Sequence, residues 1–433
     1  MATAAPAGSK IERPGDKEVA FNRPLFILSL GLFFLWGFAT VLIDILVPKL
    51  KGLFDLSFAE VMLTQFAFFL GYLVFSLPAG NIVARIGYMR GIVLGLTIMA
   101  AGCLMFAPAA RMGLFAGFLF ALFIMAAGIT TLQVAANAVI AIIGPAETGS
   151  ARLTLAQAFN SFGTFIGPLI GASLILQNDV NLPADIATLS AAKLSALRIS
   201  EASVVQVPFL GIAALLVVLI VVFWVKRDLL PHAAPDAASH GGIGFALLRR
   251  PRILFGVISI FAYVGAEVSI GSMMANYLMQ PDVLSLTALR AGQLVSIYWG
   301  GAMVGRFIGA AVLHRIRPGR VLSVCASGAI ILAALSSFSH GYMAGGTILA
   351  VGLMNSIMFP TIFALSLEGT GEDAPRASAL LCMGIVGGAI LPVVTGSVAD
   401  HLSLATALIV PIIAYGWIIF FGQFTVRASR LRP

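Results

Sequence analysis

The chain has 433 residues, of which 60% are hydrophobic and only 10% are charged. Soluble proteins carry about 25% charged residues, so the composition excludes an ordinary soluble domain and indicates a protein that crosses a membrane several times. The formal net charge of +8 would suit nucleic acid, but the basic residues follow membrane topology, and we expect no nucleic-acid partner.

Twelve apolar stretches are long enough to cross a bilayer, since a spanning helix needs about 20 mostly apolar residues. We therefore predict an all-α membrane protein with twelve transmembrane helices. Their predicted positions are 25–48, 59–84, 88–109, 113–143, 153–177, 203–225, 252–279, 290–313, 319–339, 341–367, 376–400 and 402–425. The first apolar stretch is too long for a removable signal segment and is expected to stay as a helix.

Two longer polar stretches flank the sixth predicted helix. Residues 178–202 form a predicted loop with room for a short surface helix, and residues 226–251 form a predicted linker. The linker divides the chain into an N-terminal six-helix bundle at 25–225 and a C-terminal six-helix bundle at 252–425. Residues 1–24 and 426–433 are then terminal segments outside the membrane.

The lysines and arginines predict the orientation of the helices. If the N-terminus lies in the cytoplasm, most of the 26 basic residues fall on the cytoplasmic side, as cytoplasmic loops require. We therefore expect an integral protein of the plasma (inner) membrane, surrounded by lipids, with both termini in the cytoplasm.

A weak internal repeat relates the two predicted bundles. Arg85 and Arg90 match Arg315 and Arg320 at one sequence offset, and the trio Arg152, Gly163, Pro168 matches Arg376, Gly387, Pro392 at another. Both matches keep the same direction along the chain. Such a repeat predicts two pseudo-symmetric halves related by an axis along the membrane normal.

Four side-chain amides lie in the apolar stretch from 130 to 171. Gln133 and Asn137 are four residues apart, and Gln157 and Asn160 are three apart, so each pair shares one helical face. An unpaired amide facing lipid would cost about 2 kcal/mol or more. They are candidates for binding a neutral, hydroxyl-rich ligand, and the alternative is hydrogen bonding between helices.

Two acids lie deep in predicted helices, Asp44 in the first and Glu267 in the seventh. An acid in a spanning segment is costly and usually faces a pathway, and a carboxyl group removed from water can exchange a proton near neutral pH. Both are candidates for proton coupling. The alternatives are pairing of Asp44 with Lys49 or Lys51, and a structural hydrogen bond for Glu267.

Further candidates for ligand binding lie in the first, seventh and tenth predicted helices. Trp36 stands eight residues before Asp44, and an aromatic face suits the C–H face of a sugar ring. Asn276 and Tyr277 give the C-terminal bundle a second polar cluster, to which Asn355 adds an amide.

Charged residues at the cytoplasmic turns are candidates for gating. Glu147, Glu368, Glu372 and Asp373 stand near Arg152 and Arg376, and such pairs could hold the two halves in one conformation; plain solvated charge is the alternative. The predicted gating set comprises Arg85, Arg90, Glu147, Arg152, Arg315, Arg320 and Arg376. Asp400 and Glu60 are predicted to lie at the membrane interface.

Nothing in the chain indicates an enzyme. It contains no GxSxG in a strand–turn–helix setting, no Walker A motif and no HExxH. The three cysteines, Cys103, Cys325 and Cys382, lie in apolar runs and form no metal or disulfide pattern. We expect no metal and no cofactor, and any transport would be driven by a gradient rather than by ATP.

Several stretches resemble a known family. The central linker and twelve helices are similar to the major facilitator superfamily. FFLWGFATVLIDIL, LQVAANA, GPAETGSARLTLAQAFNSFG, YVGAEVSIGS and FPTIFALSLEG resemble the L-fucose permease branch, the fucose–galactose–glucose proton symporters. The similarity covers most of residues 25–425, and the fourth and fifth helices carry its most specific part.

The resemblance implies roles for individual residues. Asp44 falls on the acid of the first helix that is implicated in proton coupling, and Asn160 falls in the motif FNSFG near the sugar site. Gln133 departs from the fucose-type members, which have a titratable Glu at this position. Either Glu267 takes over that role or Asp44 acts alone.

The sequence therefore predicts a secondary active transporter that imports a neutral monosaccharide of the glucose, galactose or fucose type with a proton, by alternating access. A drug–proton antiporter of the same fold is one alternative, and a sodium-coupled or uncoupled sugar carrier is another. A sensor of this fold that does not transport is a further alternative. The resemblance implies a monomer.

Overall fold

The computed structural model describes residues 22–144, 149–176, 191–227, 245–313, 315–370 and 373–430. The described part is helical throughout. The N-terminal half holds α1 (Arg23–Phe54), α2 (Phe58–Val61), α3 (Leu63–Ile86), α4 (Tyr88–Met112), α5 (Phe115–Ile142), α6 (Gly149–Ile175) and α7 (Ala191–Val225). The C-terminal half holds η4 (Phe245–Arg249), α8 (Pro251–Leu278), α9 (Ala288–Leu313), α10 (Pro318–Phe338), α11 (Gly341–Asn355), α12 (Met358–Leu367), α13 (Ala374–Met383), η6 (Gly384–Val386), α14 (Gly387–His401), α15 (Leu404–Ala407) and α16 (Ile409–Arg430).

Twelve helical spans among the described residues are long and apolar enough to cross a membrane, which confirms the number predicted from the sequence. The tenth span is interrupted between α11 and α12, and the eleventh between α13 and α14. These interruptions were not predicted. Hydropathy counts apolar residues over a window, so it does not detect a break in the backbone within one apolar run.

The sixth span begins earlier than the sequence predicted. Residues 191–202, predicted to lie in a loop with room for a short surface helix, are helical but continuous with the span, since they form the first turns of α7, which is 35 residues long. Their sequence, AAKLSALRISEA, is rich in good helix formers, so the helix continues beyond its apolar part. The rest of this predicted loop and most of the predicted linker, at 177–190 and 228–244, lie outside the described residues.

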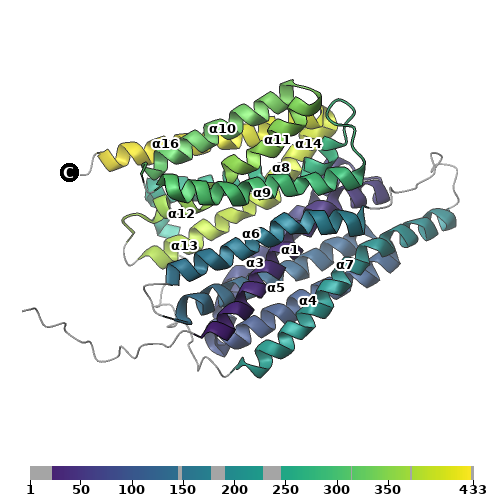
Figure 1. Cartoon of the computed structure of the whole chain (residues 1–433), viewed down its shortest axis with the longest axis horizontal. Coiled ribbons are helices and arrows are strands. Elements are labelled where there is room, and N and C mark those ends of the chain that lie inside the picture. The colour runs from purple at the N-terminus through teal and green to yellow at the C-terminus, as the bar shows by residue number, and fades with distance from the viewer. Residues whose placement is uncertain are drawn as a thin grey trace, which may run out of the picture.

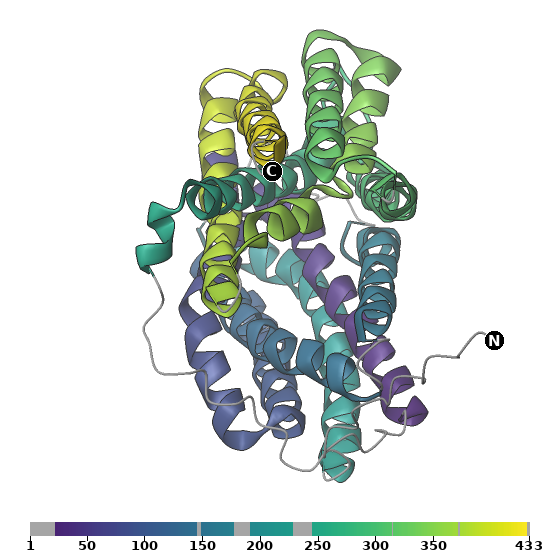
Figure 2. The ribbon, with the colours of Figure 1, turned by 90° about the vertical axis from the view of Figure 1, so that its left-hand side faces the viewer.

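Each half packs mainly on itself. In the first half α4 packs against α5 and α7, α1 against α6, and α3 against α5; in the second, α10 packs against α11 and α16, and α8 against α14 and α16. Figure 1 shows the two halves one above the other with their helices side by side, and Figure 2 shows the same division seen from the end that carries the termini.

Two glycines support the pseudo-symmetry that the repeat predicts. A Cβ on Gly163 of α6 would lie 2.2 Å from the Phe34 carbonyl oxygen of α1, and a Cβ on Gly387 of α14 would lie 1.9 Å from the Phe261 carbonyl oxygen of α8. Any larger residue would force these helices apart. The first and fifth spans therefore meet in the first half as the seventh and eleventh meet in the second.

Among the described residues, the halves contact each other mainly through α6 with α9, α14 and η6 with the α2–α3 segment, and α1 with α8. We call the end where α1 gives way to α2 the α2 end, and the opposite end the terminal end. At the α2 end, Asp400 of α14 accepts hydrogen bonds from the backbone N–H groups of Phe58 (2.6 Å) and Ala59 (2.8 Å). The structure therefore has its two halves joined at the α2 end.

Candidate functional site

The Asp44 carboxyl lies where the two halves meet. Asp44 belongs to α1 and is 7% exposed. Its Oδ1 accepts a hydrogen bond from Gln65 Nε2 of α3 (3.1 Å) and another from Ser272 Oγ of α8 (2.8 Å). Pro48, four residues further on, has no N–H to bond the Asp44 carbonyl, which weakens the helix at this turn. One carboxyl oxygen is therefore held by both halves at once.

Neither lysine that could have paired with Asp44 is engaged with it. Lys49 is 1% exposed and forms an ion pair with Glu201 of α7 at 2.8 Å, while the Lys51 ammonium lies 4.4 Å from the centre of the Phe58 ring. Two neutral donors, rather than a cation, therefore make the hydrogen bonds to Asp44. This environment suits a group that gains and loses a proton better than a permanent ion pair would.

Trp299 of α9 lies beside the Asp44 carboxyl. A Cβ on Gly271 would lie 3.3 Å from the Trp299 ring and 3.6 Å from Asp44 Oδ2, so the ring and the acid both pack closely against α8 at this residue. Within the described part of the chain, Trp299 Nε1 is buried and interacts with the Asp44 carboxyl, but it forms no hydrogen bond of regular geometry. Trp299 was not predicted as a site residue, because a lone tryptophan in an apolar run carries no spacing signal.

Glu267, a partly exposed acid, lies about one turn before Ser272 on α8. Tyr263 donates a hydrogen bond from Oη to Glu267 Oε1 at 2.7 Å, and the Arg306 guanidinium and the Asp44 carboxyl both interact with Glu267 electrostatically. The two acids belong to opposite halves, so a change of charge on one is felt by the other half.

Arg306 connects the halves on the terminal side of this cluster. It lies within α9, where it is exposed, and its Nη1 donates a hydrogen bond to Ser161 Oγ of α6. An exposed arginine within a span must face water or polar groups rather than lipid. Arg306 was not predicted as a site residue, because the sequence shows its distance from the end of the helix but not what it faces.

Asn355 is the centre of a polar network inside the second half. It is fully buried, and its amide donates to Tyr298 Oη (2.9 Å) and accepts from Tyr415 Oη (2.8 Å). The interruption after α11 frees its backbone carbonyl, which accepts from Tyr263 Oη at 3.1 Å. Both ends of this amide are occupied by protein groups, and its predicted role in substrate binding remains a prediction.

The four amides of α5 and α6 are all partly exposed. Asn160 Nδ2 donates to the Phe33 carbonyl of α1 at 3.1 Å, an approach that Gly37 permits because a Cβ there would meet the Asn160 backbone at 2.1 Å. Asn137 Oδ1 is buried and has no partner among the described residues. Gln133 and Gln157 share faces with these two.

The remaining candidates for substrate binding are buried. Trp36 is 7% exposed, Asn276 is 7% exposed, and Tyr277 is 3% exposed with its hydroxyl bonded to Ser336. Asn276 Nδ2 has no partner among the described residues. Buried amide atoms without a partner, on Asn137 and Asn276, are candidates for bonding a hydroxyl-bearing ligand.

The predicted gating residues lie in different settings. Arg152 is buried and donates to the carbonyls of Ile140 (3.0 Å) and Gly144 (3.2 Å) at the end of α5, where a cation is favourable. Arg85, Arg90, Arg315 and Arg320 are exposed. Glu147 and the side chain of Arg376 lie outside the described residues.

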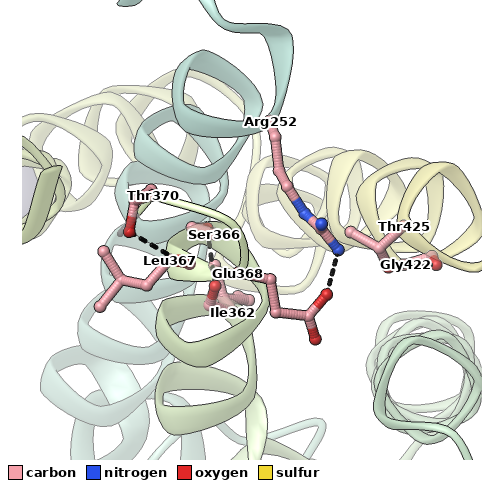
Figure 3. A network of polar contacts seen from close by, with 8 residues as sticks. All are labelled: Arg252, Ile362, Ser366, Leu367, Glu368, Thr370, Gly422 and Thr425. Carbon is pink, nitrogen blue, oxygen red and sulfur yellow. Dashed lines mark hydrogen bonds and ion pairs between the residues drawn. The ribbon is translucent and has the colours of Figure 1, made fainter. Parts of the chain in front are cut away.

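Two ion pairs near the terminal end join elements of the second half. Arg252 Nη2 lies 2.5 Å from Glu368 Oε2, as Figure 3 shows, and Arg250 Nη2 lies 2.8 Å from Asp373 Oδ2. Both pairs connect the start of α8 to the turn between α12 and α13. Glu368 and Asp373, which the sequence analysis considered as a latch between halves, therefore stabilise one half.

These features define a polytopic membrane protein with the buried Asp44 carboxyl between its two halves and with unpaired amide atoms on α5 and α8. Residues 25–392 match the Major Facilitator Superfamily. The chain belongs to this family, as the resemblance of its motifs implied.

Close relatives place the chain in one branch of the family. It is 44% identical over 424 residues to a glucose/galactose transporter of Brucella abortus (strain 9-941), with 98% of both chains covered. It is 34% identical over 426 residues to the L-fucose-proton symporter of Escherichia coli (strain K12), with 96% of this chain and 97% of that one covered. The crystal structure of the transporter FucP in the outward conformation matches with a TM-score of 0.70 and 33% identity, covering 93% of this chain and 98% of that chain.

Proposed function

We propose that this protein imports a neutral hexose of the glucose or galactose type together with a proton. The relatives with the highest identity reported above are transporters rather than enzymes, and the glucose/galactose transporter is more similar than the fucose symporter. The observation that carries the proposal is the placement of Asp44, a buried acid that accepts hydrogen bonds from both halves.

The hexose site lies, in this proposal, among the amides and indoles between the halves. Gln133, Asn137, Gln157 and Asn160 belong to the first half, and Trp299 and Asn276 to the second. Amides and an indole N–H hydrogen-bond sugar hydroxyl groups without demanding a charge on the ligand. Trp36 gives an aromatic face, and the unpaired atoms of Asn137 and Asn276 would be satisfied by the sugar. Asn355 and Tyr277, whose polar atoms are already bonded to protein groups, stabilise the second half next to the site and do not bond the sugar.

In this proposal Asp44 takes up the proton, and Glu267 is a second acid through which the proton passes. Alternating access requires sugar and proton to differ in affinity between the two conformations. Closing the α2 end removes Asp44 from water, a step that costs much more for a carboxylate than for a neutral acid. A proton taken up at Asp44 would therefore favour closure, and release through Glu267 towards the terminal end would reset the carrier.

The orientation follows from the same proposal. We place the protein in a bacterial inner membrane with both termini in the cytoplasm. The α2 end then faces outwards, and the proton gradient acts on Asp44 first. The protein works as a monomer of two six-helix bundles, at 25–225 and 252–425, joined by a cytoplasmic linker. The arginines near the terminal end take part in gating there.

Uptake into liposomes tests the proposal directly. Purified protein is reconstituted, and uptake of labelled glucose, galactose and fucose is followed with an inward proton gradient, with an inward sodium gradient and with neither. Concentration of glucose or galactose by the proton gradient alone supports the proposal. Concentration by sodium alone would transfer the coupling role to that ion, and failure to take up any hexose would overturn the sugar assignment.

A further inference from the structure

Ser272 departs from the pattern of the other buried serines on α8. Ser259 donates to the Phe255 carbonyl and Ser269 to the Gly265 carbonyl, each four residues earlier in the helix. This back-bonding is the usual way in which a serine satisfies its proton in a membrane helix. Ser272 instead donates its single proton across the boundary between the halves, to Asp44 Oδ1 at 2.8 Å.

One oxygen of the Asp44 carboxyl, Oδ1, therefore accepts hydrogen bonds from both halves. Gln65 Nε2 holds the same oxygen from within the first half at 3.1 Å, and Ser272 is fully buried. When the halves separate at the α2 end, the bond from Gln65 can persist, because both partners move together. The bond from Ser272 must break.

We propose that Ser272 is a positioning residue for proton coupling, which transmits the charge state of Asp44 from the first half to the second. The proposal rests on the proposed proton coupling at Asp44. A neutral Asp44 enters the closed junction and is held there by Ser272. An ionised Asp44 would accept the Ser272 bond more strongly, but its removal from water costs more than that bond contributes, so ionisation separates the two residues and opens the α2 end.

Other titratable groups face Asp44, and the test must separate them. Glu267 of α8 and Tyr298 of α9 both interact with Asp44 electrostatically. On α1 itself, Lys49 is paired with Glu201. Every measurement below is therefore repeated with Glu267→Gln, so that a response of Glu267 is not mistaken for one of Asp44.

The experiment measures the opening of the α2 end without requiring a substrate. Spin labels are attached at Arg111→Cys, at the end of α4, and Leu402→Cys, just after α14; both native residues are exposed, and the three native cysteines are replaced. The distance distribution between the labels is recorded from pH 5 to pH 8 in lipid nanodiscs. The variants are Ser272→Ala, Ser272→Thr, which keeps the hydroxyl, and the control Ser269→Ala, whose partners all lie in the second half.

We expect the parent protein to close at low pH and to open as the pH rises. Ser272→Ala should lower the ratio of closed to open molecules about tenfold, the effect of losing one good hydrogen bond, while Ser272→Thr and Ser269→Ala stay near the parent. Sugar exchange without a gradient should persist in Ser272→Ala, and accumulation driven by protons should fall.

The outcomes distinguish this inference from the proposed function. A Ser272→Ala protein with the parent's pH-dependent distances would overturn the role of Ser272, even if hexose accumulation is confirmed. Absence of hexose uptake with intact pH-dependent closure would overturn the sugar assignment and leave the role of Ser272 standing. A loss of closure in Ser269→Ala equal to that in Ser272→Ala would reduce the effect to general packing of α8 and contradict the inference.

Discussion

Two buried polar clusters of this protein differ in what surrounds them. The Asn355 cluster lies wholly within the second half, and both ends of its amide are bonded to tyrosines. The Asp44 cluster lies between the halves; it draws on donors from α3 and α8 and has the Trp299 indole beside it. A fully satisfied network within one half stabilises that half, whereas a network shared by two moving halves can respond to a proton or a ligand.

The largest expected effect concerns the acid between the halves. Asp44→Asn keeps an oxygen to accept the bonds from Ser272 and Gln65 but cannot titrate. A gradient of one pH unit can drive about tenfold accumulation through one proton, and this accumulation should disappear while exchange of labelled for unlabelled sugar continues. Uptake assays with and without the gradient measure both. Continued accumulation by Asp44→Asn would move the coupling to another group, with Glu267→Gln as the next variant.

The contribution of the Asn355 cluster to stability can be measured directly. Asn355→Leu removes the acceptor of the Tyr415 hydroxyl and the donor to Tyr298 Oη, which keeps only its own bond to the Glu267 carbonyl. Two such interhelical bonds are worth about 1–3 kcal/mol in a membrane protein. The apparent melting temperature in detergent should therefore fall by several degrees, with the KM for sugar little changed in the protein that remains folded.

Asn276→Leu is the matched control for this measurement. Asn276 is also buried in the second half, but its Nδ2 has no partner among the described residues, so its loss should leave the melting temperature near the parent value. If Asn355→Leu were as stable as the parent and had instead lost affinity for sugar, Asn355 would be a binding residue, as the sequence analysis predicted.

Substitution of Trp299, whose indole N–H forms no regular hydrogen bond among the described residues, tests whether the Asp44 cluster binds the sugar. Trp299→Phe keeps the aromatic ring and removes the N–H, so one hydrogen bond to a sugar hydroxyl is lost. The KM for exchange should rise by about three- to tenfold, while the melting temperature changes little. Trp417→Phe is the control, because Trp417 Nε1 donates to Ser259 at 3.1 Å within the second half. Equal KM values for Trp299→Phe and the parent would remove Trp299 from the sugar site.

The smallest effect is expected at the α2 end. Asp400→Asn removes the charge that Asp400 brings to the N-terminus of α2 but keeps one acceptor oxygen, and a charge at this position is worth about 0.3–1 kcal/mol. The ratio of closed to open molecules should fall about two- to fivefold, as measured by the distance between labels at 111 and 402. An unchanged ratio would show that packing, rather than charge, holds this end together.

The pattern of apolar runs along the chain is enough to predict the class of the protein. The number of spanning segments follows from twelve long apolar runs, because a bilayer of fixed thickness sets one length for every helix. The acids Asp44 and Glu267 were identifiable for a related reason, since ionisable groups are rare within spans and stand out in a list of apolar residues. The motif around Asn160 identified the family.

Which polar groups contact one another depends on how the helices pack, and this is visible only in the tertiary structure. Asp44 and Ser272 are 228 positions apart, and no spacing rule connects residues on helices of different halves. The same limit explains why Trp299, Gln65 and Arg306 were not selected from the sequence, and why the surroundings of Asn355 were not anticipated. An amide on a helix has the same sequence signal whether its partners are tyrosines or a ligand, because the partners come from other helices that only packing brings close.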